Sequence, residues 1–139
     1  MNTYKLPNPR LEYLNKDNKF LLLEQYATPE IIVAKDFVTD GVSSPWFARG
    51  LFPRYDKTLP AAIVHDWCYG GYMSRKNADL LFKKNLRRLG ISALRAYVMY
   101  LSVRLGGRGH YTRRQSEGLQ PNAINNVFSG ETLDGFEKP

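Results

Sequence analysis

His65 and Asp66 stand side by side in an otherwise apolar run, AAIVHDWCYGG at 61–71. Tyr69 follows four residues after the histidine, so on a helix both side chains share one face, while Asp66 lies about 100° around the axis. A polar group left unpaired in an apolar setting is costly, and a histidine there usually has a metal, a water or a carboxylate as partner. The run is therefore either one wall of a reactive site or a structural histidine with an acidic neighbour.

Two further carboxylates could complete such a site. Asp79 belongs to the next predicted helix. Because only a short turn at 70–73 separates the two helices, we expect an antiparallel pair in which Asp79 faces His65. Asp40 lies in VTDGVSS at 38–44, where Gly41 permits a tight turn that exposes backbone groups. Each carboxylate also has an ordinary explanation, as a first-turn residue favoured by the helix dipole or as a turn residue.

Strands are predicted in the first part of the chain by runs of branched and aromatic residues between turn signals. The best candidates are FLLLEQY at 20–26 and EIIVAKDFV at 30–38, joined by Ala27-Thr28-Pro29. An earlier extended piece at 11–14 can pair with them across the turn-like residues 15–18. These elements predict an N-terminal antiparallel sheet.

Three helices are predicted in the second part, at 59–69, 75–89 and 93–105, each followed by glycine. Their expected N-caps are Thr58, Ser74 and Ser92. The third helix carries apolar residues at i, i+3, i+4 and i+7 spacing, which we expect to face the core: Leu94, Tyr97, Val98, Leu101 and Leu105. On the second helix the residues expected to stay in water are Lys83, Lys84, Arg87 and Arg88. The predicted fold is α+β, with antiparallel strands followed by a three-helix core that contains an antiparallel helix pair.

The 139 residues are expected to form a single α+β domain at 1–107 and a tail at 108–139, basic at first and then polar. The composition of the tail favours disorder in isolation, so contacts would have to order it. The single cysteine, Cys68, excludes an internal disulfide framework and a cysteine zinc cluster. The first residues lack the apolar run of a signal peptide, and no window approaches the about 20 apolar residues of a membrane span.

Four segments occur in a fixed order: FVTDGVSSP, AAIVHDWCY, SRKNADLLF and ALRAYVMYLSVRLGG. Together they resemble a family of small uncharacterised phage and prophage proteins with the patterns T-D-G-x-S, H-D-x-x-Y, A-D-x-x-F and a terminal R-x-x-G. The resemblance covers roughly residues 30–107. It implies a phage origin and small size but supplies no established activity. For a phage protein we expect synthesis in the host cytoplasm and partners among other phage structural proteins, with assembly into the virion as one alternative.

A second, local resemblance concerns A-A-x-x-H-D-x-C-Y at 61–69, which is similar to the C-C-x-x-H-D-x-C-Y helix of secreted phospholipases that cleave the sn-2 ester. The resemblance implies that His65 activates a water, that Tyr69 and Asp79 orient the imidazole, and that Asp66 binds calcium. The calcium loop of those enzymes is absent in its usual form, and the segment around Asp40 is the nearest stand-in. Calcium would stabilise the oxyanion formed when water attacks an ester.

Three functions follow as hypotheses. The first is a phage-encoded, metal-assisted lipid ester hydrolase acting in infection or release, for which the basic helix face and the net charge of +7 suggest an anionic membrane surface as partner. The second is a non-catalytic virion, tail or host-interaction protein in which the His-Asp cluster is structural. The third, nucleic-acid binding, rests on the net charge alone.

Overall fold

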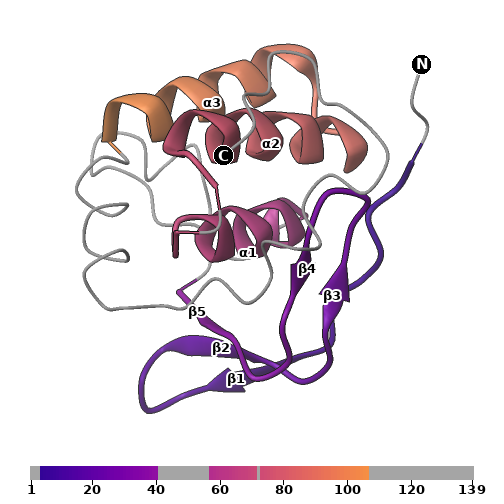
Figure 1. Cartoon of the computed structure of the whole chain (residues 1–139), viewed down its shortest axis with the longest axis vertical. Helices are drawn as coiled ribbons and strands as arrows, with labels where there is room; N and C mark the ends of the chain where they lie inside the picture. The colour runs from indigo at the N-terminus through magenta and orange to yellow at the C-terminus, as the bar shows by residue number, and fades with distance from the viewer. Residues whose placement is uncertain (1–3, 41–56, 72, 107–139) are drawn as a thin grey trace.

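Strands lie in the N-terminal part of the structure and helices follow them (Figure 1). The described residues contain three helices, and this mixture confirms the predicted α+β fold. The structure is a computed structural model that describes residues 4–40, 57–71 and 73–106. The glycine- and proline-rich segment at 41–56 and the tail predicted at 108–139 lie outside the described residues.

Within the described residues, five short strands form two small antiparallel sheets. Their bounds are β1 Leu11–Leu14, β2 Lys19–Leu22, β3 Tyr26–Ala27, β4 Ile32–Val33 and β5 Val38–Thr39. One sheet has the order β1-β2-β5 and the other pairs β3 with β4. The hairpin between β1 and β2 is the one predicted, with Asn18 in its turn at a left-handed φ of 55°.

The two long strands predicted at 20–26 and 30–38 are each divided in two, which corrects the prediction. Phe20 pairs with Thr39 and Tyr26 pairs with Val33, so both ladders are centred on the turn at 29–30 and keep one register across the gap. At the break Asp36 adopts a left-handed φ of 71° and donates from its backbone to the Leu22 carbonyl at 2.8 Å. A left-handed residue cannot continue the strand, so regular pairing stops there.

The helices begin and end within two residues of the predicted positions. Their bounds are α1 Leu59–Cys68, α2 Arg75–Arg88 and α3 Ala93–Gly106. The Ser74 and Ser92 hydroxyls accept hydrogen bonds from the backbone of the third residue after each, both at 3.2 Å, as N-caps do. Thr58 precedes α1 but its side chain makes no cap hydrogen bond. Gly90 follows the C-cap residue of α2 and has a left-handed φ of 82°, as is common where helices end.

The helices pack in the order α1, α2, α3, and each neighbouring pair is antiparallel (Figure 1). Ala61, near the start of α1, packs in one buried cluster with Phe82 and Leu86 from the second half of α2. Tyr69, just after the end of α1, packs in the other cluster with Ala78 from the first turn of α2. This second cluster also contains residues from the strands, so α1 lies between the sheets and α2.

The buried side of α3 differs from the prediction. Leu94 and Leu105, expected to face the core, are 76% and 79% exposed, and Tyr97, Val98 and Leu101 are exposed as well. The side that meets α2 carries Ala96 and Met99 instead. The small alanine side chain allows the two helix backbones to approach closely, and a periodic pattern alone does not identify which of two apolar sides meets the neighbour.

Arg88 is a second correction, because its side chain is buried rather than in water. The guanidinium is 3% exposed and forms two hydrogen bonds, each 2.6 Å, with the carboxylate of Glu30, which is fully buried. This bidentate pair ties the turn between β3 and β4 to the end of α2.

Candidate functional site

His65 and Asp79 meet between α1 and α2, as the sequence predicted. The His65 Nε2 atom lies 2.6 Å from the Asp79 Oδ1 atom. The Asp79 side chain is fully buried, while 11% of the His65 side chain remains exposed. The imidazole therefore has its carboxylate partner inside the protein and still reaches solvent.

Tyr69 completes this arrangement from the end of α1. Its hydroxyl donates a hydrogen bond to the same carboxylate oxygen, Asp79 Oδ1. The rings of Tyr69 and Phe82 lie against the imidazole, with centroid distances of 4.1 and 4.8 Å from it. The orientation of His65 is thus held by a hydrogen bond at one edge and by ring contacts on its faces.

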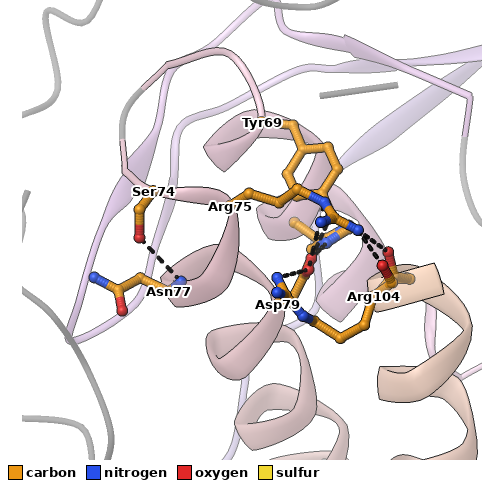
Figure 2. Close-up of polar contacts among 8 residues, drawn as sticks. Tyr69, Ser74, Arg75, Asn77, Asp79 and Arg104 are labelled. Atoms are coloured by element: carbon orange, nitrogen blue, oxygen red, sulfur yellow. Dashed lines mark hydrogen bonds and ion pairs between the residues drawn. The ribbon is translucent and has the colours of Figure 1, made fainter. Parts of the chain in front are cut away.

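Two arginines, which the sequence reasoning did not assign to the site, hold the other side of Asp79 (Figure 2). Arg104 of α3 donates from Nη1 to Asp79 Oδ2 at 2.9 Å, and Arg75 Nε lies 4.0 Å from the same oxygen. Arg75 also donates to the backbone carbonyls of Val103 and Arg104 at the end of α3. A signal for Arg104 was present, because it begins the R-x-x-G segment at 104–107.

The partners of Asp79 determine its charge. Burial by itself would raise the pKa of this carboxyl, but the hydrogen bonds from His65, Tyr69 and Arg104 and the charge of His65 together lower the pKa below its ordinary value of 3.8. Asp79 is therefore a carboxylate at neutral pH and only accepts hydrogen bonds. The pKa of the Tyr69 hydroxyl is raised, mainly by burial and next by the hydrogen bond to Asp79, so Tyr69 stays a neutral donor.

The protonation of His65 follows from this. Because Asp79 is ionised, the proton between the two side chains belongs to His65 Nε2. In a neutral imidazole the other nitrogen, Nδ1, then carries the lone pair. Within the described residues Nδ1 has no hydrogen-bond partner. The chain thus holds a buried carboxylate, an oriented imidazole and a basic nitrogen on the far side of the ring.

A protein-family model matches residues 18–103, and its description is "Protein of unknown function (DUF1353)". The chain belongs to the DUF1353 family. The matched region contains His65, Tyr69 and Asp79 and ends one residue before Arg104. No curated protein and no solved structure matches the chain.

Within the described residues, the two carboxylates expected to bind calcium are not hydrogen-bond partners of His65. Asp40, at the end of β5, is 42% exposed and lies 3.9 Å from the ammonium of Lys19. Asp66 is 8% exposed on α1 and has contacts of its own. Across residues 4–40, 57–71 and 73–106, no three His, Cys, Asp or Glu side chains gather in a way that could hold a metal ion. Gly41 to Ser44 of the expected loop lie outside the described residues.

No helix of the described chain is both long and apolar enough to cross a membrane.

Proposed function

We propose that this DUF1353 protein is a phage-encoded hydrolase of lipid esters, in which His65 is the general base. The observation that carries the proposal is the 2.6 Å contact between His65 Nε2 and the buried Asp79 carboxylate, on an imidazole that remains partly exposed. The local similarity of residues 61–69 to the active-site helix of sn-2 phospholipases supports the same roles for His65, Tyr69 and Asp79.

The proposed reaction uses the free nitrogen of His65. Nδ1 takes a proton from a water molecule, and the water oxygen forms a bond to the ester carbonyl carbon. Asp79 stabilises the imidazolium that results, and Tyr69 keeps the carboxylate in position. The tetrahedral intermediate collapses with cleavage of the ester C–O bond, and His65 returns its proton to the leaving alcohol. General base catalysis of this kind contributes about 10²- to 10⁴-fold in rate.

Calcium enters the proposal through one measurable property, the dependence of the hydrolysis rate on added calcium. Asp66 and Asp40 are the carboxylates proposed to bind it, and calcium prefers six to eight oxygen ligands. Among the described residues, neither belongs to a group of three His, Cys, Asp or Glu side chains that could hold a metal ion. The reaction steps above therefore use protein side chains alone.

The second candidate is a non-catalytic phage virion, tail or host-interaction protein. One observation favours it: Asp79 joins all three helices, since it accepts from His65 and Tyr69 of the α1 region and from Arg104 of α3. A buried carboxylate with this many donors is also what a purely structural cluster needs. Under both candidates the protein is made in the host cytoplasm. The hydrolase would act in infection or release, and the structural protein would act in the assembled particle or on the host.

The test is release of fatty acid from mixed phospholipid vesicles, with calcium and with a chelator. We expect His65→Gln to lose at least about 10²-fold in rate, the contribution of a general base. His110→Gln is the matched control, because His110 is the only other histidine in the sequence, and it should keep wild-type activity. Equal activity in His65→Gln and wild type would refute the assignment of the base. No hydrolysis by a folded wild-type protein under either condition would favour the structural candidate.

A further inference from the structure

The third helix is apolar on two opposite sides, and only one of them is buried. Ala96 and Met99 pack against α2, whereas the opposite side consists of exposed large apolar residues. This outer face of α3 is formed by Leu94, Tyr97, Val98, Leu101 and Leu105. In Figure 1, α3 is the outermost of the three helix layers. Large apolar patches that remain exposed mark interaction surfaces.

The charge around this face has one sign. Residues 74–106 contain eight Lys and Arg and one acidic residue, the buried Asp79; Arg88 is paired with Glu30 in the interior, and the other seven basic residues have no acidic residue among them except Asp79. No acidic residue occurs in α3. Lys83 of α2 lies beside α3, with its ammonium 4.8 Å from the centre of the Tyr100 ring. A second copy of the chain would bring like charges together, so the charge favours an anionic partner.

We propose that the outer face of α3 binds the surface of an anionic lipid bilayer. From Leu94 to Leu105 the face runs about 16 Å along a convex helix, a shape suited to a flat surface rather than to a pocket. Apolar residues on one side of a helix with Lys and Arg around them are typical of helices that lie in the membrane interface. Tyr97 and Tyr100 add rings whose hydroxyls favour the headgroup level.

This surface is connected to the candidate site through α3 itself. Arg104 lies beside Leu105 in sequence and donates to Asp79 at 2.9 Å, so the helix that touches the bilayer also holds the carboxylate behind His65. A role for the membrane in presenting substrate to His65 rests on the proposed function. Binding of α3 to the bilayer does not, and it can be measured without catalysis.

The test is co-sedimentation of the full chain with vesicles of phosphatidylcholine, alone or mixed with phosphatidylglycerol. We expect binding only to the mixed vesicles, weakened by added NaCl. Leu101→Glu should reduce binding about tenfold or more, because it replaces an inserted apolar side chain by a charge. Leu23→Glu, beyond the end of β2, is the matched control, since Leu23 and Leu101 are 37% and 38% exposed. It should bind within about twofold of wild type.

The outcomes separate the explanations. Circular dichroism of both variants must match wild type; if Leu101→Glu does not fold, Leu94→Glu, at a 76% exposed position, replaces it. No binding to mixed vesicles at low salt overturns the proposal, as does equal binding by Leu101→Glu and Leu23→Glu. A concentration-dependent dimer that Leu101→Glu abolishes would instead make the outer face a contact between copies. His65→Gln should bind like wild type, so loss of hydrolysis with retained binding concerns the proposed function alone.

Discussion

Replacing Asp79 by asparagine is the most direct test of how the site is built. The substitution keeps the size and shape of the side chain and removes its charge. In the wild-type protein the fully buried carboxylate faces His65 at 2.6 Å and Arg104 at 2.9 Å, with Arg75 at 4.0 Å. Removing one partner of a buried ion pair costs about 3–5 kcal/mol, because the charges left behind lose their compensation.

We therefore expect Asp79→Asn to lower the free energy of unfolding by about 3–5 kcal/mol, a large part of the about 5–15 kcal/mol typical of a small domain. The control is the same substitution at Asp40, a 42% exposed carboxylate that lies 3.9 Å from Lys19. An exposed pair of this kind contributes about 0–1 kcal/mol, so Asp40→Asn should change little.

Urea denaturation followed by circular dichroism measures both variants under the same conditions. We expect a lower urea midpoint for Asp79→Asn, while the slope of the free energy of unfolding against urea concentration stays unchanged. An unchanged slope identifies a change in stability rather than in the denatured state. If Asp79→Asn and Asp40→Asn both lose less than about 1 kcal/mol, Asp79 is not a compensated buried charge, and the inferred proton position on His65 Nε2 fails with it.

Two further predictions follow from the same physical reasoning. The pKa of Asp79 in the folded state lies below its ordinary value of 3.8. Its contribution to stability is therefore fully present above that pH and is lost as the pH falls through the folded-state pKa. The urea midpoint of unfolding should fall more steeply with acid for wild type than for Asp79→Asn. Glu30→Gln should lower the free energy of unfolding by about 3–5 kcal/mol, since it leaves the buried Arg88 guanidinium without its carboxylate. Glu12→Gln, on the exposed part of β1, serves as control for this second variant, and an equal effect of the two would contradict a structural role for the Glu30–Arg88 pair.

The sequence predicted the local elements well because their signals are local. Serine caps and glycine stops placed α2 and α3 within two residues of their observed ends. The turn at 15–18 correctly joined β1 and β2. The predicted long strands are interrupted where Asp36 adopts a left-handed backbone conformation. An aspartate in the sequence does not by itself predict that conformation.

Two of the contacts that sequence reasoning missed join residues far apart in the chain. Arg88 was expected in water, yet Glu30, 58 positions earlier, holds it in the interior. Arg104 lies 25 residues after Asp79, and only the packing of α3 on α2 brings the two together. A basic residue on a predicted helix is usually solvated. The sequence pattern therefore predicts exposed side chains for these two arginines, and only the tertiary contacts show their carboxylate partners.

What the sequence by itself determined is the identity and spacing of the candidate site residues: His65 on α1, Tyr69 four residues later and just beyond the end of that helix, and Asp79 on the helix that a short turn folds back against it. Helical periodicity and turn length suffice for that because both act over a few residues. Only the tertiary structure decided that Arg104 shares the carboxylate of Asp79, and that α3 turns its small residues inward and its leucines outward. Those outcomes depend on how closely whole helices pack, which is settled by the fit of distant surfaces to each other.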